Sequence, residues 1–587
     1  MNKKTKIICT MGPNSDNREI MKQLVLNGMD VARFNFSHGT HDEQRARYLQ
    51  LREVAEECGV PIAALLDTKG PEIRTCTLKD GKKVTLKEGQ EFILTTEELI
   101  GDENMVQINY DGLNEDVAEG NRILIDDGLI ELHVKYVDGP KIYCTVINGG
   151  ELGERKGVNV PGVKIKLPAL TDKDKEDIRF GMEMGFDYVA ASFIRSADAI
   201  QEIREILKEG NSSMGIIAKI ENEEGLDNLD AIIEASDGIM VARGDLGVEV
   251  APEKLPYLQK MMIEKCSQAC KIVITATQML DSMIRNPRPT RAEASDVANA
   301  IIDGTDSIML SGETAAGKYP IEAVNTMVRI ANYIEEHKNK ETTRSIQEQT
   351  RKAIQPSVFN AVSYSACIMA EDLNAAAIIA PSNSGTTARM VARFRPDCPV
   401  IAPTTDEHTY HQLGLSRGVV PLRMEMCEGT DNLIYNSVKV AQEAGHVKTG
   451  DVVIIVAGIP TGVSGTTNMI KAHIVGDVLI RGIGVGEGRV HGRVCNVTTV
   501  SDIAATFKDG DIIVAKMTTK EMLPYMRKAS AVIVETADEN SHAVVTCQAL
   551  GIPVIMDRFA VSVHMLKDGT TVTVDADSGF IFNGIVK

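Results

Sequence analysis

The sequence predicts an α/β protein whose largest part is a (β/α)8 barrel. Short, almost wholly apolar segments alternate with amphipathic helical segments along the first half of the chain. Polar and charged residues stand where many of these apolar segments end. The chain has 587 residues, which is enough for about four domains. In a barrel of parallel strands the functional site lies at the carboxyl ends of the strands.

Eight segments carry the near-continuous apolar runs of strands that are buried on both faces. The predicted strands are residues 6–11, 30–36, 62–67, 188–193, 216–221, 238–245, 272–278 and 307–313. Apolar residues at helical spacing predict the helices between them. These helices are residues 17–27, 42–58, 172–184, 197–208, 253–269, 291–302 and 321–337.

The repeat is interrupted after the third strand by a segment of alternating β pattern. Asp-Gly pairs at 80–81, 111–112 and 127–128 mark its turns. We expect an inserted β-barrel domain over residues 70–168 that closes on substrate as a lid; a passive insertion is the alternative. The barrel then occupies residues 1–69 and 169–341.

A second α/β domain is predicted over residues 342–474, after a charged link at 335–351. It holds the tetrapeptide Ser-Gly-Thr-Thr twice, at 384–387 and at 464–467. Each copy is expected to follow a strand and to precede a helix, where hydroxyls and free amides form an anion cradle. A simple capping turn is the alternative at each copy.

The end of the chain is predicted to be a separate module, residues 475–587. Closely spaced glycines at 476–492 indicate a hinge before it, and a compact α/β pattern follows from residue 494.

Composition limits the classes of function. Lys and Arg number 63 against 82 Asp and Glu, and the net charge of −19 argues against nucleic acid as the main partner. The 11 cysteines are scattered, as in reduced intracellular proteins. We find neither a signal peptide nor an apolar run long enough for a membrane span, so a cytoplasmic protein without a membrane partner is expected.

The most informative stretch of sequence is the strand that ends in Lys219 and Glu221. Alternation along a strand places both side chains on the same side. Asp245 ends the next strand, beside Gly244. A lysine and two carboxylates at adjacent strand ends suit a divalent metal that holds an anionic oxygen substrate. A structural ion pair under a turn is the alternative. Polar residues follow other strands as well: Arg33, Asn35, Ser37, Asp67, Thr68, Thr277 and Glu313.

Seven motifs resemble those of the pyruvate kinase family, and they occur in the family's order over residues 1 to about 474. They are Ala-Arg-Phe-Asn-Phe-Ser-His-Gly at 32–39, Asp-Thr-Lys-Gly-Pro-Glu-Ile-Arg-Thr at 67–75, Ala-Lys-Ile-Glu-Asn at 218–222, Ala-Arg-Gly-Asp-Leu-Gly at 242–247, Thr-Ala-Thr-Gln-Met-Leu at 275–280, Pro-Arg-Pro-Thr-Arg-Ala-Glu at 287–293 and Leu-Ser-Gly-Glu-Thr at 310–314. The resemblance implies phosphoryl transfer from phosphoenolpyruvate to ADP, giving pyruvate and ATP. It also implies a homotetramer activated by a phosphorylated allosteric effector.

The resemblance assigns roles to individual residues. It implies catalysis by Lys219, Arg33 and Thr277, with substrate held by these three and by Gly244 and Asp245. Mg2+ or Mn2+ would be bound by Glu221 and Asp245, and K+ by Asn35, Ser37, Asp67 and Thr68. Glu72 matches the K+-requiring branch. Nucleotide contacts fall on Asn35, Phe36, Ser37, His38, Arg74 and Lys156, and effector contacts on Ser382, Ser384, Gly385, Thr386, Thr387, Ser464 and Gly465.

The final module resembles the phosphohistidine domain of phosphoenolpyruvate-using synthases and dikinases through Ser541-His542-Ala543 and the Leu-Gly-Ile-Pro at 550–553. Glu539-Asn540 stands where those domains carry Thr-Ser. No segment supplies the nucleotide-grasp domain that a phosphohistidine carrier needs. We therefore expect a packing or regulatory appendage in which His542 is not phosphorylated.

Two other functions remain open on the sequence. A metal-dependent aldolase or lyase could use the same barrel and metal to stabilise an enolate, although Arg74, Lys156 and the lid favour a nucleotide substrate. A non-catalytic sugar-phosphate sensor would need only the Ser-Gly-Thr-Thr loops, and the intact set of Lys219, Glu221 and Asp245 argues against it.

Overall fold

A computed structural model describes residues 3–337, 340–459, 467–476, 478–497 and 499–586. The chain divides into two compact units. The first contains Met1–Cys367, Ala380–Met426 and Gly462–Asn468, and the second contains Ile368–Ile379, Cys427–Thr461 and Met469–Lys587. Among the described residues, no helix combines the length and the apolar character needed to cross a membrane.

Eight parallel strands close into a barrel in the order β1-β16-β15-β14-β13-β12-β3-β2, as the sequence predicts. The strands are β1 (Lys6–Thr10), β2 (Val31–Asn35), β3 (Ala63–Asp67), β12 (Tyr188–Ala191), β13 (Gly215–Ile220), β14 (Gly238–Ala242), β15 (Ile272–Ala276) and β16 (Ser307–Leu310). Their side chains alternate between two cores. In β1, Ile8 belongs to the cluster inside the barrel, whereas Ile7 and Cys9 pack in the cluster shared with the helices.

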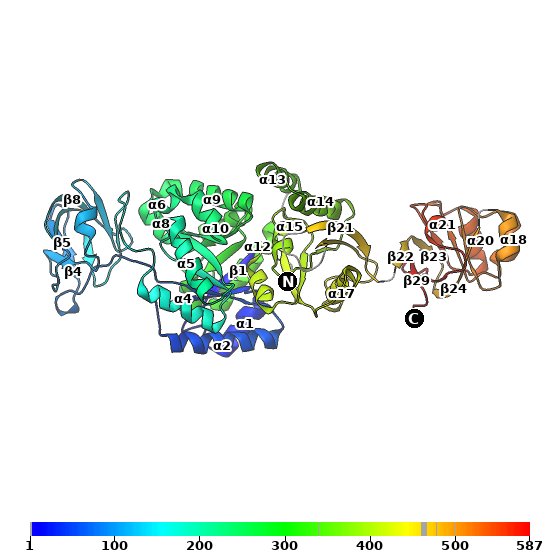
Figure 1. Ribbon diagram of the computed structural model, residues 1–587, viewed down its shortest axis with the longest axis horizontal. Helices are drawn as coiled ribbons and strands as arrows, with labels where there is room; N and C mark the ends of the chain where they lie inside the picture. Colours follow the sequence, from blue (N-terminus) through cyan, green and yellow to red (C-terminus); the bar gives the residue numbers. More distant parts are fainter. Residues whose placement is uncertain (1–2, 338–339, 460–466, 477, 498, 587) are drawn as a thin grey trace. The chain divides into compact units, whose positions relative to one another are not determined.

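The barrel helices (Figure 1) mostly follow the predicted segments. They are α1 (Arg18–Asn27), α2 (His41–Cys58), α4 (Asp172–Met184), α5 (Ala197–Glu209), α6 (Glu223–Asp227), α7 (Leu229–Ala235), α8 (Arg243–Glu249), α9 (Leu255–Ala269), α10 (Arg291–Asp303), α11 (Gly312–Ala315) and α12 (Pro320–Glu336). Thr40, Thr171 and Thr290 form capping boxes at the starts of α2, α4 and α10. These caps satisfy backbone N–H groups that otherwise lack partners.

Most predicted strands end one or two residues too late, and two others extend three residues too far. The sequence predicts strand as far as residues 245 and 313, but β14 ends at Ala242 and β16 at Leu310. Short helices follow at once, so Asp245 lies in the first turn of α8 and Glu313 in that of α11. The apolar runs stop where these helices start.

The insertion after β3 is a β domain. A six-stranded sheet has the order β11-β7-β8-β9-β5-β6, and β10 pairs with β4 as a separate ladder. The strands are β4 (Val84–Leu86), β5 (Glu91–Thr95), β6 (Met105–Gln107), β7 (Arg122–Ile125), β8 (Ile130–Asp138), β9 (Lys141–Asn148), β10 (Gly150–Leu152) and β11 (Val158–Asn159), with a single turn of helix, α3 (Leu113–Asp116). Apolar side chains from one face, such as Phe92, Leu132 and Ile142, form its own core.

The predicted second α/β region also forms. In the first unit β18 (Val400–Thr404) pairs in parallel with β19 (Val419–Arg423), and in the second β17 (Ala377–Ile379) pairs in parallel with β20 (Val452–Gly458). The helices are α13 (Lys340–Ala353), α14 (Val358–Asp372), α15 (Thr386–Ala392), α16 (Glu407–Gln412) and α17 (Thr430–Glu443). The charged link predicted at 335–351 is therefore mostly helical, since α12 ends at Glu336 and α13 begins at Lys340.

The prediction for the second Ser-Gly-Thr-Thr was wrong in one respect. The tetrapeptide precedes a strand, β21 (Thr467–Ile474), and not a helix. Residues 460–466, including Ser464 and Gly465, lie outside the described residues. Only the first copy stands between a strand, β17, and a helix, α15.

The last module is an eight-stranded sheet in the order β22-β29-β28-β24-β25-β26-β27-β23. Its strands are β22 (Val478–Arg481), β23 (Ile483–Val485), β24 (Arg489–Val497), β25 (Ile512–Ala515), β26 (Ala531–Val534), β27 (Val554–Met556), β28 (Thr571–Asp575) and β29 (Phe580–Asn583), and its helices are α18 (Val500–Thr506), α19 (Leu523–Met526), α20 (His542–Leu550) and α21 (Ser562–Met565). The hinge predicted at 476–492 is wrong for most of its length, because β22, β23 and the start of β24 belong to this sheet.

Candidate active site

Lys219 is the centre of the predicted site and is almost fully buried at the end of β13. Its Nζ lies 3.1 Å from Asp67 Oδ1 and 3.0 Å from Glu221 Oε1, and it donates to Ser192 Oγ at 2.7 Å. The expected convergence of Lys219 and Glu221 on one side of the strand is therefore confirmed. Burial lowers the pKa of Lys219, but Asp67 and Glu221 raise it by more, so the ammonium stays charged.

Asp67 joins Lys219 to Arg33. Arg33 Nε donates to Asp67 Oδ2 at 2.6 Å, and its NH1 donates to Thr10 Oγ1 at 3.0 Å. The residues meet because β2 and β3 are neighbours and Arg33 pairs with Leu65, two residues before Asp67. Burial raises the pKa of Asp67, but Arg33 and Lys219 together hold it below its usual value. Two cations are thus fixed at one carboxylate.

Glu221 and Asp245 are two buried carboxyls held against each other. Burial raises the pKa of Glu221 to about 7, opposed by Lys219 and supported by Asp245. Burial likewise raises the pKa of Asp245, and a hydrogen bond joins the two side chains. Glu221 Oε2 also accepts from the Phe193 N–H at 2.6 Å. Two adjacent buried carboxyls resist ionisation because their negative charges would repel each other. A hard divalent cation bound between them would stabilise both in the ionised form.

Thr277 follows β15 in a left-handed backbone conformation, with φ of +65°. Its hydroxyl donates to Ala276 O at 2.7 Å and accepts from the Gly244 N–H at 2.8 Å. The buried guanidinium of Arg243 donates to Thr277 O at 2.8 Å and pairs with Asp296. These contacts hold Thr277 in a backbone conformation that is rare for threonine. Such strained residues are common at functional sites.

The four residues expected to bind K+ gather at the ends of β2 and β3. Asn35 pairs with Asp67 across the two strands, and the Asn35 side chain accepts from the Ser37 N–H at 3.0 Å. Thr68 is buried, and its hydroxyl accepts from the Ser192 N–H at 3.1 Å. These oxygens suit a monovalent cation.

The residues expected to contact nucleotide fall into two groups. Arg74 and Lys156 line one cavity, where Arg74 pairs with Glu72 and Lys156 with Asp126. Asn35 ends β2, Phe36, Ser37 and His38 form the turn after it, and none of the four lines that cavity. The Phe36 ring is buried against the rings of Phe180 and Phe186, so the side chain faces the core.

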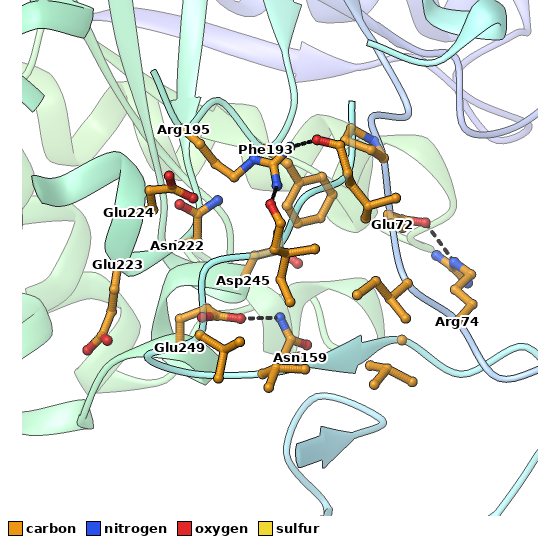
Figure 2. Close-up of a pocket in the computed structure, with 18 of the residues that line it drawn as sticks. Glu72, Arg74, Asn159, Phe193, Arg195, Asn222, Glu223, Glu224, Asp245 and Glu249 are labelled. Atoms are coloured by element: carbon orange, nitrogen blue, oxygen red, sulfur yellow. Dashed lines mark hydrogen bonds and ion pairs between the residues drawn. The ribbon is translucent and has the colours of Figure 1, made fainter. Parts of the chain in front are cut away.

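The cavity has a volume of about 480 Å3 and lies between the inserted β domain and the barrel. Figure 2 shows Arg74 beside Glu72 and Asn159 of β11 beside Glu249 of α8. Nine carboxylates and five basic side chains line it, and Asp245 connects it to the Lys219 cluster. A cavity with this excess of carboxylates needs added cations before it can hold a polyphosphate.

Comparison with known proteins identifies the family. The model for the pyruvate kinase barrel domain matches residues 2–324, and the model for the pyruvate kinase alpha/beta domain matches residues 360–473. A third model, for the mobile domain of PEP-utilising enzymes, matches residues 507–579. The chain belongs to the pyruvate kinase family. It is therefore a phosphotransferase that moves the phosphoryl group of phosphoenolpyruvate to ADP.

The relatives agree over the whole length. The chain is 47% identical to pyruvate kinase of Sporosarcina psychrophila over 585 residues, covering 99% of each chain. It is 47% identical to that of Geobacillus stearothermophilus over 587 residues, covering 100% of this chain and 99% of the other. A solved pyruvate kinase from Cryptosporidium parvum aligns with a TM-score of 0.77 and 39% identity, covering 81% of this chain and 96% of that chain. These matches decide against the aldolase or lyase and the sensor.

Within a pyruvate kinase site, two neighbours of the predicted residues were missed from the sequence. Ser192, just after β12, accepts from Lys219 and donates to Thr68 O at 2.7 Å. Glu249 accepts from Asn159 at 2.8 Å, and burial raises its pKa to about 7. Only the β12–β13 register brings Ser192 beside Lys219. A lone Glu in a helix gives no such signal in sequence.

The first Ser-Gly-Thr-Thr stands at the start of α15, as the sequence predicts. Gly385 has a φ of +69°, and the Ser384 and Thr386 hydroxyls lie 2.9 Å apart at the start of α15. Thr387 is buried, with its hydroxyl 2.8 Å from that of Thr467. Ser382 is half-buried and its N–H donates to Pro403 O. Ser384 and Thr386 are therefore the more accessible pair.

His542 is the first residue of α20, and its Nδ1 lies 2.8 Å from Thr518 Oγ1. The side chain is half-buried. Ser541 Oγ is buried without a hydrogen-bond partner among the described residues.

Proposed function

We propose that Lys219 and Arg33 stabilise the phosphoryl group in transfer, with phosphoenolpyruvate held at the ends of β2, β13, β14 and β15. The observation that carries the proposal is the buried Lys219, which stays charged between Asp67 and Glu221. A fixed ammonium stabilises charge that develops on a transferring phosphoryl group without reorganising at the moment of reaction. Arg33 is held beside it by Asp67, at 2.6 Å.

The charge balance of the cluster supports the metal cofactors. Lys219 and Arg33 supply two positive charges against the three carboxyls of Asp67, Glu221 and Asp245. An anionic substrate needs a net positive site, so added cations are required. Glu221 and Asp245 would hold Mg2+ or Mn2+, which supplies Lewis-acid stabilisation of phosphoryl and enolate oxygens when bound. Asn35, Ser37, Asp67 and Thr68 would hold K+.

Substrate orientation falls to the turn that contains Gly244 and Thr277. The Gly244 N–H is held by Thr277 Oγ1, and the backbone beside it would seat the substrate carboxylate next to Asp245. The Thr277 proton is already donated to Ala276 O. The hydroxyl therefore positions a water that protonates the enolate carbon, and is not itself the acid.

ADP would enter the cavity between the inserted domain and the barrel. Arg74 and Lys156 must exchange Glu72 and Asp126 for phosphate oxygens, an exchange favoured because both side chains are more than one third exposed. The Asn159 to Glu249 hydrogen bond ties the inserted domain to α8, which also carries Asp245. Closure of the inserted domain would thus act on Asp245, one of the proposed metal ligands, through this short helix.

The proposed enzyme is regulated by an effector and assembles into a homotetramer. A phosphorylated effector would bind at Ser382, Ser384, Gly385, Thr386 and Thr387, with Ser464 and Gly465 from the second loop. The four chains of a homotetramer, as the family resemblance implies, would be detected as a fourfold mass in light scattering.

The test of the proposed function is pyruvate formation from phosphoenolpyruvate and ADP, followed by coupled NADH oxidation. We expect the rate to require ADP and a divalent cation, to rise with K+, and to respond to a phosphorylated effector. A rate that is independent of ADP would contradict the proposal.

A further inference from the structure

A second cavity lies at the opposite end of the barrel from Lys219. It has a volume of about 50 Å3 and is lined by Ile272 and Val273 at the start of β15 and by Asp306, just before β16. Its other wall comes from α15 and from the segment that ends at Arg417. Both walls belong to the first compact unit. The active-site residues stand at the carboxyl ends of the same strands, so this cavity is separate from them.

The cavity is strongly cationic. Five basic side chains line it against a single carboxylate, Asp306: Lys271, Arg389, Arg393, Arg395 and Arg417. Arg389 donates to Ser384 O at 2.7 Å, Arg395 donates to Gly304 O, and Lys271 donates to Glu234 O at 3.1 Å. Neutral carbonyls satisfy hydrogen bonds but do not cancel charge.

Three buried polar atoms at this cavity lack partners among the described residues: Arg393 Nε, Arg417 Nε and Ser416 Oγ. Arg417 is 8% exposed and Ser416 4% exposed. The nearest carboxylate oxygen of Glu335 lies 3.4 Å from Arg417 NH2, which leaves Nε unmatched. Buried donors are almost always satisfied in folded proteins, so a cluster of orphans around one space indicates a missing acceptor.

The burial and backbone conformation of Arg395 indicate that keeping positive charge at this cavity is energetically unfavourable. It is 8% exposed and adopts a φ of +53°, which is rare for a side chain of this size. Burial and the neighbouring Arg417 lower the pKa of Arg395 to about 10. Asp306 and Glu335 oppose this lowering only in part. Buried like charges that outnumber the nearby carboxylates are stabilised by an anion.

An adjoining cavity of about 620 Å3 shares Cys270, Lys271, Ile272 and Arg389 with the first. Basic and polar side chains line it, among them Lys208, Asn211 and Ser212, together with one carboxylate, Asp237, which pairs with Arg204. The smaller cavity has room for a tetrahedral anionic group, and the larger one has room for the polar molecule to which that group is attached.

We propose that these cavities form an anion site for a phosphate group, free or as the monoester of a small polar metabolite, distinct from the Ser-Gly-Thr-Thr loop. Arg393 Nε, Arg417 Nε and Ser416 Oγ donate to the phosphate oxygens, and Lys271 and Arg389 balance its charge. The site is independent of the catalytic roles proposed above.

The test is isothermal titration of the full chain with inorganic phosphate, in a Thr386→Glu background that closes the effector loop. Arg393→Gln and Arg389→Gln each remove one cation from a half-buried position. We expect each to weaken phosphate binding about tenfold or more, because Arg393→Gln removes a charged hydrogen bond and Arg389→Gln removes a balancing positive charge. Arg18→Gln, which removes an exposed arginine of α1, should leave binding unchanged. Phosphate that binds at the active site contributes equally to the parent and to the arginine variants, so it does not change the difference between them.

Glucose 6-phosphate distinguishes the two sources of the group. Tighter binding than inorganic phosphate, weakened by Lys208→Gln, assigns the site to a phosphate monoester; equal binding assigns it to free phosphate. Basal turnover should stay unchanged in Arg393→Gln and Arg389→Gln, which also verifies that both variants fold. No phosphate binding in the Thr386→Glu parent, or equal binding in the parent and both arginine variants, would overturn the proposal.

Discussion

At the scale of single residues, the site depends on charges that are buried in pairs. Lys219 faces Asp67 and Glu221, Arg33 faces Asp67, and Glu221 faces Asp245. A buried charged side chain loses its hydration, and in each of these pairs the contact with the partner offsets part of that loss. The two carboxyls raised in pKa are the ones that Mg2+ would use, whereas Asp67, which pairs with two cationic side chains, is held ionised.

Glu221→Gln and Asp245→Asn should each weaken Mg2+ binding, because each removes an anionic oxygen from a hard cation. Titration of the rate against Mg2+ measures the change, and the half-saturating concentration should rise in both variants. Glu223→Gln, at a neighbouring carboxylate of the cavity, is the control. An unchanged Mg2+ dependence in both variants would place the metal elsewhere.

Glu249 makes the metal-free protein sensitive to pH. Its pKa is about 7 when folded and about 4.5 as an ordinary glutamate, so the folded state holds an extra proton between these values. Stability therefore falls as pH rises from about 4.5 through about 7. Glu249→Gln, which keeps an acceptor for Asn159, should remove on the order of 2 kcal/mol of this fall.

Thermal unfolding midpoints of the full chain, measured from about pH 5 to about pH 8, test this change. Glu253→Gln, at an exposed glutamate of the same region, is the control. A pH dependence that is equal in Glu249→Gln and the parent would mean that the Glu249 carboxyl is ionised in the folded state.

At the scale of elements, the strands of the barrel were predictable and their ends were not. Near-continuous apolar runs mark parallel strands, and the alternation that puts Lys219 beside Glu221 is local. The start of α8 at Arg243 and of β21 at Thr467 depends on packing, which leaves no periodic signal in a few residues. Ser192 was missed for the same reason, because its role comes from a partner on another strand.

Thr386→Glu or Thr387→Glu should abolish activation by a phosphorylated effector yet spare the rate at saturating phosphoenolpyruvate. A carboxylate at the start of α15 repels the phosphate that the loop would bind, and the loop lies far in sequence from Lys219. Kinetics with and without effector measure the change. Thr430→Glu, at the start of α17, is the matched control. Activation that persists in both loop variants would show that the effector binds at a different site.

At the scale of the whole molecule, we expect the final module to contribute stability rather than chemistry. Its sheet is complete within residues 478–583, and the Phe580 ring lies against Gly450, where a Cβ would come within 2.0 Å of it. The glycines of 476–492 were mistaken for a hinge because several of them mark close packing: a Cβ on Gly484 would come within 1.8 Å of Ala576 O.

His542→Ala and truncation after about residue 475 should both leave turnover nearly unchanged. The barrel holds the groups for direct transfer to ADP, and the contact of Phe580 with Gly450 is structural. Truncation should lower the thermal midpoint, whereas His542→Ala should not. A large fall in rate for His542→Ala, or radiolabel retained on His542 after incubation with labelled phosphoenolpyruvate, would show that the module takes part in transfer.

The central claim is that the Lys219 ammonium stabilises the transferring phosphoryl group, and Lys219→Met tests it most directly. Turnover should fall on the order of 10²- to 10³-fold or more, because a preorganised charge is removed from the transition state. Mg2+ binding, measured by titration of the same variant, should be largely kept, since Glu221 and Asp245 remain. A correctly folded Lys219→Met enzyme with near-parental turnover would contradict the account.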